Sequence, residues 1–174
     1  MFIRNLENSI TGVFSTKIFF ADLFVAAFIY FLPALSHLTN FPLYIIEPMR
    51  IAVVFCLLNT NRKNALFIAV TVPLFSFFIS SHPAVFKSLL IIAELLVNLI
   101  FFNVLIRKQS VFISMFLSII ISKIFYYSGK FILIQMNLVE GGLFSSPIYI
   151  QWIIAFVLSL YAAVVFEKEI QPKT

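Results

Sequence analysis

Charge is scarce in this sequence: only 11% of its 174 residues are Asp, Glu, Lys or Arg, against about 25% in soluble domains. Cysteine occurs once, so an internal disulfide, and with it a disulfide-stapled secreted module, is excluded. Hydrophobic residues make up 62% of the chain. A soluble fold of this length cannot hide that much, because roughly a third of the surface of the unfolded chain stays exposed after folding. The chain therefore needs lipid as its solvent.

The sequence also lacks the residue clusters that membrane enzymes and ATPases use. It contains no H-E-x-x-H pair, no G-x-S-x-G turn, no Walker motif and no glycine-rich phosphate loop. Its two histidines, His37 and His82, stand at loop edges without cysteine or acidic partners at ligand spacing. We therefore expect no enzyme activity, no metal site and no cofactor.

Long apolar runs separated by short polar breaks dominate the chain. A membrane-spanning helix needs about 20 mostly apolar residues, whereas the strands of a membrane barrel require an alternation that is missing here. We predict an all-α integral membrane protein, with six transmembrane helices in one bundle and a single domain. The predicted spans cover residues 18–37, 43–58, 65–80, 88–106, 111–135 and 147–166.

The basic residues of the loops predict the orientation of these spans. Arg62 and Lys63 follow the second span, and Arg107 and Lys108 follow the fourth, on the same side as both chain ends. Basic loops stay in the cytoplasm, so we predict a multi-pass plasma or inner membrane protein with both termini cytoplasmic. The net charge of +5 is thus membrane-topology charge and does not indicate nucleic-acid binding. Apolar residues at helical spacing within 1–15 predict an interfacial helix before the first span.

The few polar groups inside the spans gather at one depth. A charge at the centre of a spanning helix costs about 2.5–3.5 kcal/mol on insertion scales, so each needs a physical reason. With the predicted orientation, these groups fall in the outer half of four spans, on shared helix faces. They are Glu47, Arg50, Glu94, Asn98, Lys123, Tyr127, Lys130 and Trp152. Polar groups that converge in an apolar bundle predict an outward-facing substrate cavity.

Each of these residues also has a structural explanation. Glu47 and Arg50 are three residues apart and can form an ion pair within one helix. Glu94 and Lys123 are of opposite sign on different spans and can pair across the bundle. Lys130 can extend its ammonium group to the outer headgroups, and the aromatic residues can belong to an interfacial belt.

Residues 33–95 contain a series of short, largely apolar motifs, most of which include a proline, and the last of them is Glu94-Leu95. The motifs are Pro33-Ala34-Leu35, Pro42-Leu43-Tyr44, Pro48-Met49, Pro73-Leu74-Phe75-Ser76-Phe77-Phe78, His82-Pro83 and Glu94-Leu95. The spacing from the proline and serine of the third span to the Glu-Leu pair of the fourth is the most specific part. With the length and the six-span architecture, the pattern resembles the substrate-binding S-component of energy-coupling factor (ECF) vitamin transporters.

The resemblance implies capture of a vitamin-like molecule on the outer side, with energy supplied by a transmembrane coupling subunit and ATPase subunits. It also implies that the loop at 37–42 helps to cover the site. The charges of the predicted site, three positive against two negative, favour an anionic or zwitterionic ligand. Lys123 would hold that ligand, with Tyr127 or Trp152 stacking on an aromatic part of it.

Two other functions are consistent with the sequence. One is a non-catalytic membrane scaffold or assembly subunit of a cell-envelope complex, similar to the small cell-shape protein of the rod system. Its polar residues would pair with one another or face a partner. The other is a small membrane enzyme acting on lipid, with Glu94 or His82 as base. An open cavity lined by the polar layer would favour ligand capture, whereas a filled bundle with mutual pairs would favour the scaffold.

Overall fold

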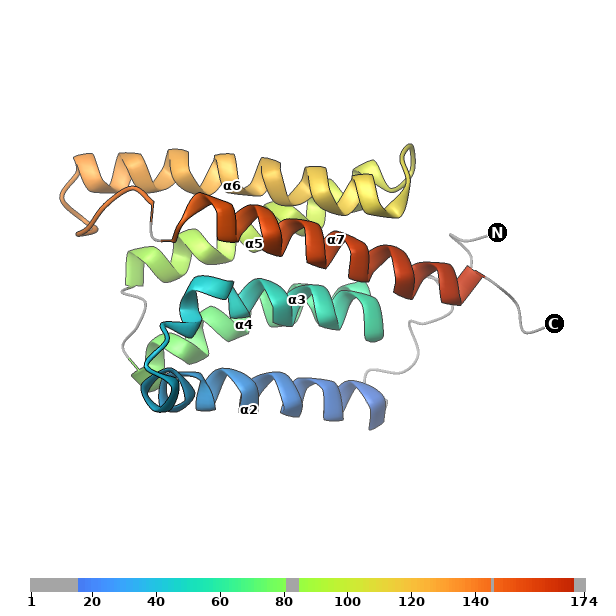
Figure 1. Cartoon of the computed structure of the whole chain (residues 1–174), viewed down its shortest axis with the longest axis horizontal. Coiled ribbons are helices and arrows are strands. Elements are labelled where there is room, and N and C mark those ends of the chain that lie inside the picture. The colour runs from blue at the N-terminus through green and yellow to red at the C-terminus, as the bar shows by residue number, and fades with distance from the viewer. Residues whose placement is uncertain (1–15, 81–84, 145, 171–174) are drawn as a thin grey trace.

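The computed structural model describes residues 16–80, 85–144 and 146–170 of the chain (Figure 1). In these ranges the protein is entirely helical, with six α-helices, one short 3-10 helix and no strand. The elements are α2 (Thr16–Thr39), η2 (Leu43–Ile46), α3 (Pro48–Asn59), α4 (Arg62–Ser80), α5 (Val85–Leu105), α6 (Val111–Gln135) and α7 (Ile148–Ile170). The predicted interfacial helix over 1–15 lies outside the described residues.

Four helices have the length and composition of membrane spans. They comprise Ile18–Thr39, Val85–Leu105, Val111–Gln135 and Ile148–Phe166. Their outward surfaces carry large apolar side chains, of which Phe24, Ile124 and Val157 are each more than half exposed. Exposing apolar surface to water costs about 25 cal/mol of free energy per Å², whereas contact with lipid tails carries no such cost. The helices and their apolar surface identify a membrane protein with transmembrane helices.

The second predicted span, residues 43–58, is not one continuous helix. It consists of η2 and the 12-residue α3, separated at Glu47, whose φ and ψ of 55° are left-handed. Pro48 explains the break, because a proline disfavours the right-handed helical conformation in the residue before it. At 1.5 Å per residue α3 is about 18 Å long, which is short of the hydrocarbon core of about 30 Å.

The other predicted spans correspond to helices, with ends shifted by a few residues. The span at 111–135 coincides with α6, and its start is capped by Ser110, whose hydroxyl accepts from the Ile113 N–H. Residues 65–80 belong to α4, which has 19 residues and begins at Arg62. Because α4 is not among the four helices that qualify as spans, its crossing of the membrane stays a prediction.

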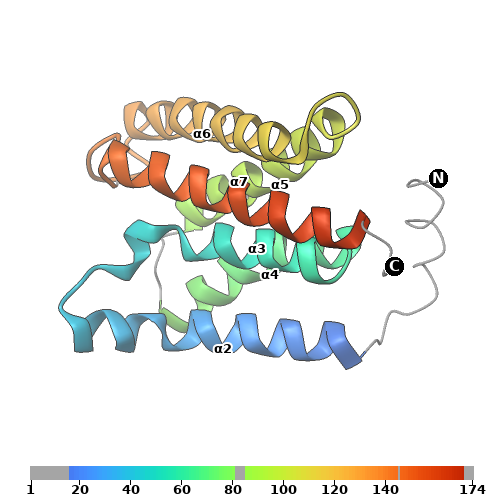
Figure 2. The ribbon, with the colours of Figure 1, turned by 45° about the vertical axis from the view of Figure 1, so that its right-hand side comes forward.

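The short α3 lies at the centre of the bundle (Figures 1 and 2). Its side chains belong to two apolar clusters. On one side Val53 packs with residues of α2, α4 and α5, including Leu95. On the other side Val54 packs with residues of α5, α6 and α7, including Met115. Burial by its neighbours thus stabilises a helix that is too short to cross a membrane alone, and it places the first turn of α3 inside the bundle.

The two ends of the bundle differ in charge. Arg62, Lys63, Arg107 and Lys108 are exposed and lie at the end that contains the α3–α4 and α5–α6 connections, on the right in Figure 1. The opposite end is formed by η2, the last turns of α2 and α6 and the first turn of α7. We call this opposite end the cavity end, because residues of η2, α2 and α6 line a cavity there.

Candidate functional site

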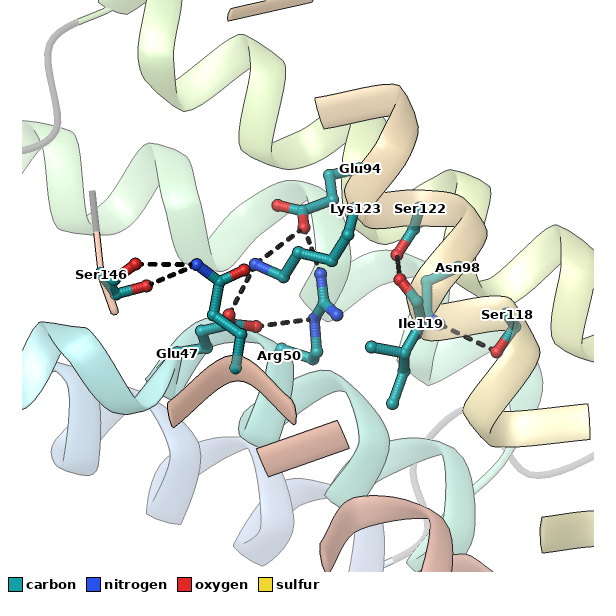
Figure 3. Close-up of polar contacts among 10 residues, drawn as sticks. Glu47, Arg50, Glu94, Asn98, Ser118, Ile119, Ser122, Lys123 and Ser146 are labelled. Carbon is teal, nitrogen blue, oxygen red and sulfur yellow. Dashed lines mark hydrogen bonds and ion pairs between the residues drawn. The ribbon is translucent and has the colours of Figure 1, made fainter. Parts of the chain in front are cut away.

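Four charged side chains from three neighbouring parts of the fold meet inside the bundle (Figure 3). Arg50 Nε lies 3.2 Å from Glu47 Oε2, and Arg50 Nη2 contacts Glu94 Oε1. Lys123 Nζ lies 2.5 Å from Glu47 Oε1 and 3.3 Å from Glu94 Oε1. Cations and anions therefore alternate around a closed ring with no net charge, the ionic quartet of Glu47, Arg50, Glu94 and Lys123. The quartet contains both ion pairs that the sequence suggested, Glu47 with Arg50 and Glu94 with Lys123.

The quartet is shielded from its surroundings. The side chain of Arg50 is 2% exposed and that of Glu94 is 7% exposed, while Glu47 and Lys123 stand at 14% and 15%. Glu94 lies about 14 Å from the first residue of α5 at 1.5 Å per residue, which is close to the middle of that helix. Pairing explains how four charges stand at this depth, because an uncompensated buried charge costs several kcal/mol.

Aromatic rings complete the surroundings of Lys123. Its ammonium nitrogen lies 5.6 Å from the ring centroid of Tyr126 and 5.9 Å from that of Tyr127. These distances are in the range of cation–π attraction. Tyr127 packs in turn against Phe144, with ring centroids 5.0 Å apart. Two carboxylates and two rings therefore hold the Lys123 ammonium in one place.

A cavity of about 500 Å³ adjoins the quartet at the cavity end of the bundle. All four quartet residues contribute to its wall, as do Tyr126 and Tyr127. Much of the remaining wall is apolar and comes from α2, α3 and α5, with Ile29, Leu32, Pro33, Met49, Ile91 and Leu95. Volumes of 300–1,000 Å³, apolar walls and a few convergent polar groups are typical of small-molecule sites.

No family model, curated protein or solved structure matches this chain. The chemistry of the cavity is therefore defined by its own residues. Mostly apolar walls suit an apolar or aromatic molecule, and the quartet offers both charge signs to polar groups on that molecule.

Three residues predicted for the site do not line the cavity. Asn98 is 1% exposed, and its Nδ2 donates to Ser118 Oγ at 3.0 Å, one turn beyond Glu94 on α5 (Figure 3). Lys130 is 3% exposed and buried on α6, outside the lining. Trp152 is 52% exposed on α7 and packs against Phe116, with ring centroids 5.7 Å apart. Of the eight predicted residues, the structure brings together the quartet and Tyr127 around the cavity.

One charged residue of the cavity wall is not among the residues predicted for the site. Lys87 is partly buried in α5 and lines the cavity. A signal for it was present, since Lys87, Ile91 and Glu94 are spaced i, i+4 and i+7 and share one face of a helix. All three line the cavity.

Proposed function

We propose that this chain is the membrane-embedded subunit that captures a small, vitamin-like molecule for an ATP-driven uptake transporter. The observation that carries the proposal is the cavity of about 500 Å³ whose wall contains the ionic quartet. A scaffold held together by ion pairs has no need of a hollow beside them. A ligand site needs the hollow, the apolar wall and a few fixed polar groups.

The distribution of basic residues supports an outward-facing cavity. Arg62, Lys63, Arg107 and Lys108 are exposed at the end opposite the cavity, and basic loops stay in the cytoplasm. In this arrangement all six helices α2 to α7 belong to the membrane bundle, with η2 extending the short α3 toward the outer surface. Both termini are cytoplasmic, and the ligand enters from outside.

The energy for uptake would come from partners. The sequence has no Walker motif, and the resemblance of residues 33–95 to ECF S-components implies a transmembrane coupling subunit and ATPase subunits. The chain would bind the molecule, and the partners would drive its release on the other side.

The closed quartet also favours a second candidate function. Glu47, Arg50, Glu94 and Lys123 balance one another's charge without any ligand, as the polar residues of a membrane scaffold in a cell-envelope complex would. The two functions predict different molecules bound to the purified protein: a small molecule for the capture subunit, and only protein partners for the scaffold.

Native mass spectrometry of the full chain, purified from its own membranes in mild detergent, separates these functions. We expect one small molecule per chain, which is released on collisional activation. Glu94→Gln and Lys123→Gln should lose it, because both residues line the cavity, whereas the exposed control Lys108→Gln should keep it. Circular dichroism verifies that each variant is folded.

An absent adduct, or one that persists in both cavity variants, contradicts the capture function. Co-purified proteins provide the second readout. A transmembrane coupling subunit with ATPase subunits supports uptake, whereas assembly proteins of the cell envelope without any small molecule support the scaffold.

A further inference from the structure

Lys87 is a charged residue of the cavity wall that does not belong to the ionic quartet. It stands in the first turn of α5, is partly buried, and lines the cavity on the same helix face as Ile91 and Glu94. None of the ion pairs among the described residues includes Lys87.

The charges of the cavity wall are therefore unbalanced. Three cations, Arg50, Lys87 and Lys123, face two carboxylates, Glu47 and Glu94. The quartet uses both carboxylates for Arg50 and Lys123, which leaves the ammonium group of Lys87 without a compensating anion among the described residues. A partly buried cation in a membrane protein is stabilised when an anion binds beside it.

The position of α6 makes the surroundings of Lys87 more positive still. Gly129 of α6 packs so closely on Leu90 of α5 that an added Cβ would lie 2.6 Å from Leu90 Cδ1. Lys87 is one helical turn before Leu90, and the buried Lys130 follows Gly129 directly. A second cation is thus brought to the same contact between α5 and α6, which strengthens the attraction for an anion.

The rest of the wall defines the remainder of the ligand. Apolar side chains of α2 and α5, including Ile29, Leu32 and Ile91, and the ring of Tyr127 line the same cavity as Lys87. These groups suit an apolar or aromatic body and offer little to a second charged group.

We propose that Lys87 binds the anionic group of the captured molecule, and that the cavity selects small monoanions with an apolar or aromatic body. The inference rests on the proposed capture function. The quartet carries no net charge and offers its polar atoms to other polar groups of the ligand, while Lys87 supplies the net positive charge that discriminates among ligands.

Three probes with one ring system test this charge selection. Indole-3-acetate carries one negative charge, indole-3-acetamide is neutral and tryptamine carries one positive charge. Their dissociation constants are measured by ligand-observed NMR on the full chain in phosphatidylcholine nanodiscs, with protein-free nanodiscs as the baseline. We expect the acetate to bind about tenfold or more tightly than the acetamide, as one charge-assisted hydrogen bond predicts, and tryptamine to bind most weakly.

Matched variants assign that preference to one residue. Lys87→Gln should bring the acetate down to the affinity of the acetamide and leave the acetamide unchanged. Lys87→Arg should keep the preference, because it keeps the charge, and Lys108→Gln should behave as the unmodified chain. Circular dichroism shows that each variant is folded.

Equal binding of the three probes, or a preference that survives Lys87→Gln, overturns the inference. Loss of acetate binding when phosphatidylglycerol is added would identify a lipid phosphate as the anion at Lys87 and overturns it as well. If none of the probes binds while native mass spectrometry finds a small molecule, only the inference about Lys87 fails. If no small molecule is found either, the capture function fails with it.

Discussion

Arg50 is the residue whose loss should destabilise the fold most among the four members of the ionic quartet. Its guanidinium group bridges Glu47 and Glu94, and its side chain is 2% exposed. In Arg50→Met two buried carboxylates must share Lys123, which leaves one negative charge uncompensated. Breaking a buried pair in this way costs about 3–5 kcal/mol of unfolding free energy.

Lys123→Met provides the matched comparison. The side chain of Lys123 is 15% exposed, and Arg50 still contacts both carboxylates after Lys123 is removed. We therefore expect a smaller loss, of at most about 2 kcal/mol. The double variant Arg50→Met/Glu94→Gln removes one charge of each sign and keeps the pair of Lys123 with Glu47, so it should be more stable than Arg50→Met alone.

Unfolding free energies are measured by titrating sodium dodecyl sulfate into mild-detergent micelles. Far-ultraviolet circular dichroism and the fluorescence of Trp152, the single tryptophan, report the transition. The coupling between Arg50 and Glu94 should be about 0.5–3 kcal/mol, the range for residues in one ion-pair network. An additive double variant would refute the argument that charge balance in the ring stabilises the bundle. Equal losses for Arg50→Met and Lys123→Met would refute the argument that the deeper burial of Arg50 raises the cost of its removal.

Three further results follow from the structure. Trp152→Ala should leave the small-molecule adduct in native mass spectrometry unchanged, because Trp152 faces outward. Tyr127→Ala should lower the affinity for the small molecule by about three- to tenfold, because an aromatic contact in the cavity is lost. The reverse ranking would place the ligand against α7. In a Cys56→Ala background, a membrane-impermeant maleimide should label Glu140→Cys in intact cells and Lys108→Cys only after permeabilisation, and inverted labelling would place the cavity in the cytoplasm. The native thiol of Cys56, 0% exposed in α3, should react with maleimide only after unfolding in dodecyl sulfate, and rapid reaction in mild detergent would show that α3 is not enclosed.

The helices that face lipid could be predicted from the sequence, because their signal is local. The apolar run at 111–135 begins after a capping serine and becomes α6 with both ends as predicted. The run at 43–58 looked equivalent in composition, yet it divides at Glu47 into η2 and α3. Pro48 marks the break locally, but the burial that lets α3 exist as a short central helix comes from helices that are distant in the chain.

The candidate site was predictable to the extent that charge is costly in an apolar bundle. Glu94 and Lys123 stood out for that reason, and both line the cavity. Lys130 and Trp152 were predicted at the same depth, in the outer half of their spans, yet neither residue lines the cavity. Helical spacing tells which residues share a face, but it does not tell whether that face is turned toward the cavity, toward a neighbouring helix or toward lipid.

Composition determined that the chain is a membrane protein with few, costly charges, because apolar surface on this scale has no other stable environment. The long apolar runs without alternation determined that it is helical. The tertiary structure decided how those charges are used. α5 and α6 pack closely at Leu90 and Gly129, and in this arrangement Glu94 contacts Arg50 and Lys123, while Lys123 also contacts Glu47. Lys87 also lies on the cavity wall, a position that the scarcity of charge alone does not predict.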